Sequence, residues 1–319
     1  QYSTSEDTLS KLAKKHEIIR LILEWRSLQK LLTTYVYSLP KQIHPKSNKI
    51  HTEFNQTLTT TGRLSSTNPN LQNIPVRTDR GKLIRKSFIP KDKNYTLLCA
   101  DYSQVELRII AFLSGDSNMK NAFINNEDIH RSTAARVFNV NIDDVNEEQR
   151  RNAKIVNFGI IYGVSAFGLS NQTDLTRSES KEIINNYFKS YPKLKEYMSD
   201  QISFARNNGY VETILKRKRY LPEINSRNAI LRSSAERNAI NTPVQGSAAD
   251  IIKLSMIKID HEFEKRSLSS KLLLQVHDEL VFDVHFSEID IVKKIIIDNM
   301  ENVIQMDVPL KVDIGFGDN

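Results

Sequence analysis

The spacing of apolar residues divides the 319-residue chain into helices and strands. Recurrence every three to four residues predicts helices over 17–39, 105–113, 132–138, 178–190, 193–209 and 288–304. Shorter apolar or β-prone runs predict strands at 97–100, 272–284 and 310–314, and a hairpin or edge strands within 49–61. The pattern therefore predicts a chain that mixes helices with strands throughout.

An acidic residue ends the first apolar run. Leu97–Ala100 suits a strand buried on both faces, and Asp101 lies where it stops, ahead of Ser103, Gln104 and a helical segment that carries Glu106. A carboxylate held rigidly at the end of a buried strand can bind a hard metal ion. The alternative is that Asp101 caps the following helix, and on its own this is the commoner arrangement.

Four side chains in the middle of the chain share one helix face. Arg150, Lys154, Phe158 and Tyr162 recur every fourth residue, so at about 100° per residue they form one slowly turning stripe. The cationic half, at the positive end of the helix dipole, could hold a triphosphate, and the aromatic half a planar base. The alternative is that the two aromatic residues belong to the core and the two basic residues to a solvated face. That alternative does not explain why all four lie on one stripe.

A second acidic site is predicted at the tip of a hairpin. Two β-prone runs within Leu272–Val284 flank a tight turn that contains His277, Asp278 and Glu279. Neighbouring side chains on a strand face opposite ways, so Asp278 and Glu279 are not expected to play the same role.

The segment 61–75 is a loop by composition, because it is rich in Ser, Thr, Asn and Pro. It carries Arg63, Gln72 and Asn73, whose donors can reach phosphates, sugars and base edges. A solvated loop is the ordinary interpretation, but a long polar loop is also a common place for function.

A later helix repeats this polar character. Arg237, Asn241 and Gln245 recur every fourth residue, and Pro243 is expected to kink the helix. Such a stripe can be merely solvated, as can the basic cluster at 216–219, but both also suit contacts with nucleic acid.

Composition narrows the class of protein. Hydrophobic content of 39% and charged content of 26% are ordinary for a globular protein, and a net charge of +7 makes a polyanionic partner plausible. The single cysteine, Cys99, excludes an internal disulfide and fits a reducing compartment, which we expect to be the cytoplasm. No apolar run is long enough to span a membrane and no signal peptide is present. The chain begins like the interior of a sequence, so we expect a part of a longer protein.

The three motifs together resemble those of the family A DNA polymerases, the bacterial DNA polymerase I family. Asp101–Arg108, Arg150–Gly163 and Gln275–Glu279 are similar to the three polymerase motifs in their order along the chain. Thr61–Pro75 and Asn241–Asp250 also resemble family signatures. The match runs over nearly the whole chain, and the combination is far more specific than any one motif.

The resemblance implies an α+β fold of the right-hand polymerase architecture, with an antiparallel palm sheet that carries both acidic motifs. We expect residues 1–42 to form the base of the thumb, 114–232 the fingers, and 43–113 and 233–319 the two parts of the palm. Most of the thumb is expected to be absent, and the chain is expected to act as a monomer.

The implied activity is that of a nucleotidyltransferase, a DNA-directed DNA polymerase of replication and repair. It adds a deoxynucleotide to a primer 3′-hydroxyl and releases pyrophosphate, by phosphoryl transfer with two Mg²⁺ ions. The resemblance implies that Asp101 and Asp278 are metal ligands, that Lys154 donates a proton to pyrophosphate, and that Glu279 is an accessory acid. The partners are primer–template DNA and deoxynucleoside triphosphates.

The resemblance also assigns binding roles, residue by residue. The implied nucleotide-binding residues are Arg150, Lys154, His130, Phe158, Tyr162, Glu106 and Gln104. Within this set Glu106 would exclude a ribose 2′-hydroxyl. The implied DNA-binding residues are Arg63, Gln72, Asn73, Arg237, Asn241, Gln245 and His277.

Two other classes of protein remain as alternatives to a polymerase. A two-metal nuclease would use clustered acids but has no need of the stripe from Arg150 to Tyr162. A catalytically inactive nucleic-acid-binding module would have no reason to keep Asp101 together with Asp278. Primer extension with Mg²⁺ and labelled deoxynucleotides separates these classes from a polymerase.

Overall fold

A computed structural model of the chain describes residues 3–13, 15–76 and 78–319. The chain forms two compact units. One comprises Gln1–Gln56, Leu64–Lys93 and Asp318–Asn319, and the other comprises Thr57–Arg63 and Asn94–Gly317.

The first unit is built from short elements. Its elements are α1 (Glu6–Leu12), α2 (Glu17–Leu31), a π-helical turn (Leu32–Val36), a 3-10 helix (Leu39–Gln42), β1 (Glu53–Asn55), β2 (Ser65–Thr67) and α3 (Asp79–Arg85). The helix predicted over 17–39 thus ends as an α-helix at Leu31.

Part of the segment read as a loop by composition is a strand. β2 pairs with β1 in antiparallel register, with Phe54 opposite Ser66. The Ser66 side chain is buried, and its hydroxyl lies 2.6 Å from Thr52 Oγ1 and accepts a 2.9 Å hydrogen bond from the Leu71 amide. Composition points to solvent for such a residue, but a hydroxyl that finds two partners can be buried at little cost.

The second unit contains a four-stranded sheet in the order β6-β7-β3-β8, and every neighbouring pair is antiparallel. Its strands are β3 (Tyr95–Tyr102), β6 (Lys271–Val276), β7 (Glu279–His285) and β8 (Val312–Gly317). The sheet confirms the α+β class and both predicted acidic strands. Because β3 lies between β7 and β8, the end of β3 is brought next to the β6–β7 turn.

Helices make up most of the second unit. They are α4 (Val105–Ser114), α5 (Ser117–Ile124), α6 (Ile129–Phe138), α7 (Glu147–Ile161), α8 (Ala166–Ser170), α9 (Arg177–Ser190), α10 (Pro192–Asn208), α11 (Ala229–Lys265) and α12 (Ile289–Glu301), with 3-10 turns at Ile142–Asp144, Pro222–Asn225 and Phe286–Glu288. A small hairpin joins β4 (Tyr210–Glu212) to β5 (Lys218–Tyr220).

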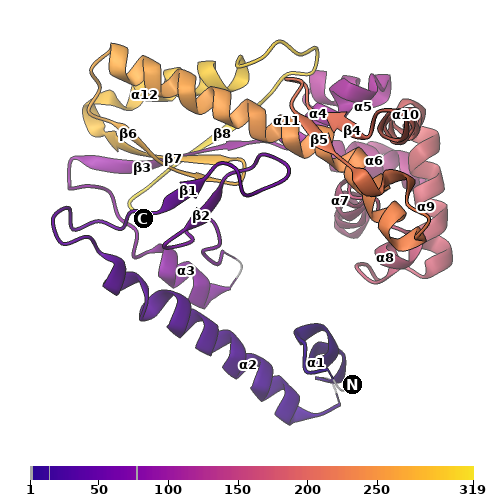
Figure 1. Cartoon of the computed structure of the whole chain (residues 1–319), viewed down its shortest axis with the longest axis horizontal. Helices are drawn as coiled ribbons and strands as arrows, with labels where there is room; N and C mark the ends of the chain where they lie inside the picture. The colour runs from indigo at the N-terminus through magenta and orange to yellow at the C-terminus, as the bar shows by residue number, and fades with distance from the viewer. Residues whose placement is uncertain (1–2, 14, 77) are drawn as a thin grey trace. The chain divides into compact units, whose positions relative to one another are not determined.

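The 37-residue helix α11 connects the sheet with the helical part of this unit. It lies with α12 along the sheet and reaches the cluster of α4 to α10 (Figure 1). Pro243, where a kink was predicted, lies inside this helix, which continues past it to Lys265. No helix in the described ranges is both long and apolar enough to cross a lipid bilayer.

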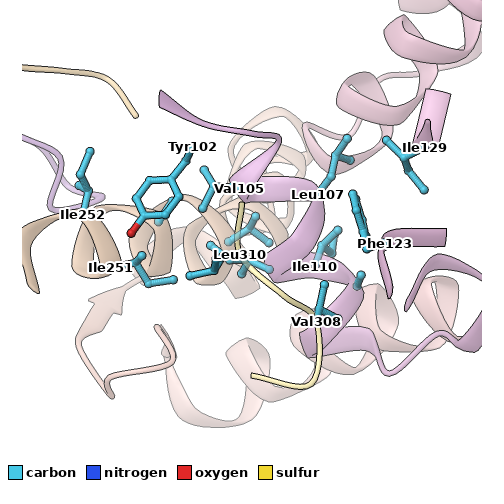
Figure 2. Packing of buried hydrophobic residues seen from close by; sticks show 14 of the residues in the cluster. Tyr102, Val105, Leu107, Ile110, Phe123, Ile129, Ile251, Ile252, Val308 and Leu310 are labelled. Carbon is cyan, nitrogen blue, oxygen red and sulfur yellow. The ribbon is translucent and has the colours of Figure 1, made fainter. Parts of the chain in front are cut away.

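One large core fixes the strand and helix that meet at Asp101. Leu98 of β3 and Leu107 and Ile110 of α4 are fully buried. In Figure 2 the side chains of α4 lie between Ile251 of α11 and Phe123 of α5. Each such side chain contributes about 1.5–3 kcal/mol by leaving water, so this junction is held firmly from both sides.

Candidate active site

A cavity of about 610 Å³ lies within the second unit and collects most of the predicted site residues. Its lining comes from the end of β3, the start of α4, one face of α7, the start of α6 and the β6–β7 turn. The lining residues are Arg63, Asp101, Tyr102, Ser103, Gln104, Val105, Glu106, His130, Arg150, Lys154, Phe158, Tyr162, His277, Asp278 and Asp313.

Asp101 projects from the end of a strand and does not cap a helix. It is an exposed position of β3, whereas the residues before it in the strand are buried or half-buried. The N-cap of α4 is Gln104, in the left-handed conformation with φ 51°. The buried Arg108 fixes this turn, because its Nε donates to the Ser103 carbonyl oxygen at 2.9 Å and its Nη1 to the Pro309 carbonyl oxygen at 2.6 Å. The capping alternative is therefore wrong.

Three further acidic residues, from the neighbouring strands and the β6–β7 turn, lie close to Asp101. Asp101 pairs in register with Glu279 on β7 and with Asp313 on β8, and the Tyr102 amide donates to the Asp278 carbonyl oxygen at 3.2 Å. Burial, followed by the negative charges of Asp278, Glu279 and Asp313, raises the pKa of Asp101 to about 6. Glu279 does not line the cavity, which agrees with separate roles for Asp278 and Glu279.

These carboxylates fit a hard divalent cation. Carboxylate oxygens are the ligands that Mg²⁺ prefers, and a cation would offset the repulsion that raises the pKa of Asp101. In the part of the chain that the structure describes, no three acidic, histidine or cysteine side chains form a complete metal cage. An ion held by Asp101 and Asp278 would thus take its other ligands from substrate phosphates and water, as Mg²⁺ commonly does.

The predicted stripe on α7 also lines the cavity. The helix begins at a capping box of Asn146 and Gln149, and Tyr162 is its C-cap. Arg150 Nε donates to Asp128 Oδ2 at 2.8 Å, while Asp128 Oδ1 accepts from the amides of His130 and Arg131 at the start of α6. Burial opposes ionisation of Asp128, but these hydrogen bonds and the charge of Arg150 lower its pKa.

Lys154 differs from Arg150 in having no ion pair. Its side chain is exposed, and none of the described acidic residues lies within pairing distance of it. It therefore presents an uncompensated positive charge to the cavity.

His130 is buried beside this stripe. Its exposed fraction is 3%, and its ring lies 5.8 Å from the ring of Phe158 between centroids. Burial, together with the charges of Lys154 and Arg150, lowers the pKa of His130 to about 4, although Asp128 opposes the shift. The ring is therefore neutral at physiological pH, unlike the two cations next to it.

Glu106 joins the two sides of the cavity. Arg63 Nη2 donates to its Oε1 at 2.5 Å, and the Tyr162 hydroxyl donates to its Oε2 at 2.5 Å. Burial raises the pKa of Glu106, against the effects of Tyr162 and Arg63. Both carboxylate oxygens are occupied, so the side chain is held in one place.

The polar stripe on α11 approaches the end of α7. The Gln245 side chain lies near the Tyr162 hydroxyl, where it opposes the effect of burial, which raises the pKa of that hydroxyl. Arg237 covers Gly163, since a Cβ there would lie 2.8 Å from Arg237 Cγ, and the φ of 70° at this residue also requires glycine. Asn241 Oδ1 is buried without a partner among the described residues.

The two remaining predicted DNA-binding residues, Gln72 and Asn73, belong to the first unit. The Asn73 carbonyl oxygen accepts a 2.6 Å hydrogen bond from Tyr35, and the Gln72 amide donates to Asn70 Oδ1 at 3.0 Å. Their role in binding DNA stays a prediction.

The basic cluster at 216–219 is partly internal. Arg217 donates to Asp250 Oδ1 at 2.8 Å and to the carbonyl oxygens of Thr61 and Gly246 at 2.8 and 2.9 Å. Arg219 donates to Thr242 Oγ1 at 2.8 Å. Only the lysines of this cluster keep exposed charges, so a phosphate contact by all four residues is not supported.

Two cavity features lay outside the sequence prediction. Asp313 enters only because β8 pairs with β3, and register between distant strands leaves no local signal. Asp128 aims Arg150 from just outside the cavity lining, and its bond to Arg150 depends on how α6 packs against α7, which no local pattern specifies.

Comparisons with known proteins agree with this geometry. The family model described as DNA polymerase family A matches residues 1–319. DNA polymerase I of Bacillus subtilis (strain 168) is 51% identical over 99% of this chain and 36% of its own length, and DNA polymerase I of Caldicellulosiruptor bescii is 52% identical over 100% and 37%. The chain thus spans little more than a third of these relatives.

A solved structure shares the fold. The POL domain of Pol1 from M. smegmatis, in complex with DNA primer-template and dNTP, matches with a TM-score of 0.93 and 43% identity. The match covers 99% of this chain and 56% of that one. With a family model that covers every residue, the chain belongs to DNA polymerase family A.

Proposed function

We propose that this chain is a template-directed DNA polymerase, which adds deoxynucleotides to a primer 3′-hydroxyl and releases pyrophosphate. One observation carries the proposal. A single cavity is lined both by the acidic residues Asp101 and Asp278 and by a face of α7 that is cationic at one end and aromatic at the other. This arrangement suits a nucleoside triphosphate whose reacting phosphate must meet metal-binding carboxylates.

Asp101 and Asp278 are the residues that would hold two Mg²⁺ ions. When bound, Mg²⁺ would activate the primer hydroxyl and offset the charge of the phosphates. The protein's own contribution is rigid placement, since β3 is anchored by the core and the Asp278 backbone is bonded to Tyr102. Glu279, next to Asp278 and in register with Asp101, serves as an accessory acid.

Arg150, Lys154 and His130 bind the triphosphate. Arg150 is aimed by Asp128, whereas Lys154 forms no ion pair with a described residue and can donate a proton to the departing pyrophosphate. A positioned general acid of this kind contributes about 10²–10⁴-fold to a rate.

Phe158 and Tyr162 continue the same face of α7 toward the base and sugar. The Phe158 ring packs on the incoming nucleotide, and Tyr162 lies beside the template base. Glu106, fixed by Arg63 and Tyr162, occupies the space of a ribose 2′-hydroxyl, so that ribonucleotides are excluded. Gln104, in the turn between β3 and α4, contacts the same nucleotide.

Primer–template contacts are assigned to the polar side chains around this cavity and to the first unit. The residues proposed are Arg63, Gln72, Asn73, Arg237, Asn241, Gln245 and His277. We also propose that the chain divides as the polymerase resemblance implies. Residues 1–42 are the base of the thumb, 43–113 and 233–319 are the palm, and 114–232 are the fingers. The protein is proposed to act as a monomer in the cytoplasm, where Cys99 stays reduced.

Primer extension tests the proposal against its two rivals. A labelled primer annealed to a longer template is incubated with Mg²⁺ and either all four deoxynucleotides or three of them. A polymerase lengthens the primer and stops where the missing nucleotide is needed. A shortened primer would indicate a nuclease, and an unchanged primer that still binds the protein would indicate a binding module.

A further inference from the structure

A buried chain of hydrogen bonds lies behind His130. Asn157 Nδ2 is 3.0 Å from His130 Nδ1, Thr133 Oγ1 donates to Asn157 Oδ1 at 3.2 Å, and Thr133 Oγ1 lies 3.0 Å from the Tyr191 hydroxyl. Thr133, Asn157 and Tyr191 are fully buried. The chain links α6 and α7 to the residue that follows α9.

The direction of each proton follows from the chemistry of the groups. The carbonyl oxygen of Asn157 can only accept, so the single hydroxyl proton of Thr133 points to it. The Tyr191 hydroxyl must then donate to Thr133. With its oxygen fixed on Thr133, the Asn157 amide turns its nitrogen, which can only donate, toward His130 Nδ1.

We propose that Asn157 is a positioning residue, which holds His130 as the neutral Nε2–H tautomer so that the ring offers a hydrogen-bond donor to a phosphate oxygen of the nucleoside triphosphate. The identity of the ligand rests on the proposed function, but the tautomer does not. Because Nδ1 is occupied by Asn157, the proton must reside on Nε2. Among the described residues none hydrogen-bonds to Nε2, and His130 lines the cavity.

The tautomer matters because the ring is uncharged. The charged or titratable groups around His130 are Asp128 on its own helix, Arg150 and Lys154 on α7, and Tyr191 beyond α9. Burial and the two cations keep the pKa of His130 at about 4. A neutral ring cannot attract phosphate by charge, so it binds only if Nε2 carries the proton. The opposite tautomer would direct a lone pair at an anion.

Asn157→Asp is the sharpest test, because it keeps the size of the side chain and replaces a donor by an acceptor. Thr133 can still donate to the carboxylate, whereas His130 must now present Nδ1–H. At high pH the ring should then carry its proton on Nδ1 and none on Nε2. At low pH it should become an imidazolium, with its pKa raised by the new charge.

The tautomer can be measured without nucleotide. The full chain is labelled with ¹⁵N-histidine, and long-range ¹H–¹⁵N NMR correlations at pH 8 report which ring nitrogen is protonated, with His130→Gln to assign the signal. The wild type should show Nε2–H and Asn157→Asp should show Nδ1–H. Asn152→Asp is the matched control, a buried Asn on the same helix that does not bond to His130, and it should keep Nε2–H.

Nucleotide affinity supplies the second readout. Binding of a non-hydrolysable deoxynucleoside triphosphate analogue to the protein with primer–template is compared at pH 6 and pH 8. Asn157→Asp should bind about 10-fold or more weakly at pH 8 and less weakly at pH 6, because the fraction of His130 that is an imidazolium regains an Nε2–H. General damage to the fold would weaken binding equally at both pH values.

Each outcome decides between distinct claims. A wild-type His130 protonated on Nδ1, or charged at pH 8, overturns the inference whatever the enzyme does. The expected tautomers without the pH-dependent loss of affinity overturn the role of His130 as a donor. A protein with the Nε2–H tautomer that binds no nucleotide contradicts the proposed function instead. If Asn157→Asp does not fold, Thr133→Val frees the amide to rotate and should yield a mixture of tautomers.

Discussion

The Tyr162 hydroxyl and the Glu106 carboxylate are joined by a 2.5 Å hydrogen bond, although one belongs to the end of α7 and the other to the first turn of α4. Arg63 holds the other oxygen of Glu106. The side chain proposed to exclude a ribose 2′-hydroxyl is thus fixed by two residues, which act from different segments of the chain.

Tyr162→Phe should therefore weaken sugar selection without removing it. The variant keeps the ring but leaves Glu106 held by Arg63 alone. We expect the preference for deoxynucleotides over ribonucleotides to fall by several-fold, and by much more in Glu106→Ala. The measurement is the ratio of kcat/KM for the two sugars in single-nucleotide incorporation. An unchanged ratio in both variants would place the selecting group elsewhere.

Phe158 offers a second test of the stripe. Its ring lines the cavity between the cationic end of α7 and Tyr162, and it has no hydroxyl. The 3′-hydroxyl of a normal substrate can make a polar contact to its own triphosphate, and a dideoxynucleotide lacks that contact, so we expect strong discrimination against dideoxynucleotides. Phe158→Tyr would supply a hydroxyl there, and one contact to a charged group is worth about 1.5–3 kcal/mol.

Discrimination in Phe158→Tyr should accordingly drop by about 10- to 150-fold, with little change for the natural substrate. Competitive incorporation of the two nucleotides by both proteins measures the effect. A wild type that already accepts both equally would show that Phe158 does not face the sugar.

The raised pKa of Asp101 has a consequence for stability. The folded-state pKa is about 6 and the unfolded value about 3.9, so between these pH values the folded protein binds more protons. Stability from this group is present below pH 4 and is lost as the pH rises to 6. In metal-free buffer at pH 7.5, Asp101→Asn should stabilise the fold by about 1 kcal/mol, allowing for the partial exposure of the group, while it abolishes incorporation.

Denaturant unfolding at pH 5 and pH 7.5 tests this expectation, with Asp298→Asn on the exposed side of α12 as the control. The gain should be smaller at pH 5. Added Mg²⁺ should stabilise the wild type more than Asp101→Asn. A variant that is less stable than the wild type at pH 7.5 would show that the clustered acids do not repel one another.

Local sequence patterns predicted those parts of the site that belong to a single helix or strand. The stripe from Arg150 to Tyr162 needs only the helical period, and the acid at the end of β3 needs only the boundary of an apolar run. Both patterns are present in the structure, because burial of the apolar residues in the hydrophobic core stabilises the helix and the strand that the patterns predict. The hairpin that carries Asp278 followed from two β-prone runs and a short turn.

Contacts between distant segments could not be read from the sequence. Asp313 depends on the register of β8 with β3, and Asn157 depends on the packing of α6 and α7. Ser66 was assigned to a loop, because its contact with Thr52 depends on the pairing of β2 with β1. In each case a polar residue gains its role from a partner that no local pattern specifies.

Arg217 illustrates the same point and yields a prediction on stability. Its guanidinium donates to Oδ1 of Asp250, whose side chain is 9% exposed, and to two carbonyl oxygens. Arg217→Gln leaves that carboxylate without its charged partner and should destabilise the fold by about 2–4 kcal/mol. The neighbouring Lys216 is 80% exposed, so Lys216→Gln should change stability by less than about 0.5 kcal/mol. Denaturant titration of both variants measures the difference, and equal effects would contradict an internal role for Arg217.

The central claim is that Asp101 and Asp278, from separate elements, act on one nucleotide in one cavity. Single-turnover incorporation of the templated nucleotide is measured for the wild type, Asp101→Asn, Asp278→Asn and the double variant, each with saturating primer–template and Mg²⁺. If the two carboxylates act as a unit, each single variant should lose nearly as much rate as the double variant, because groups that act together are not additive. Near-normal incorporation by either single variant, in a protein that remains folded and bound to DNA, would contradict the claim.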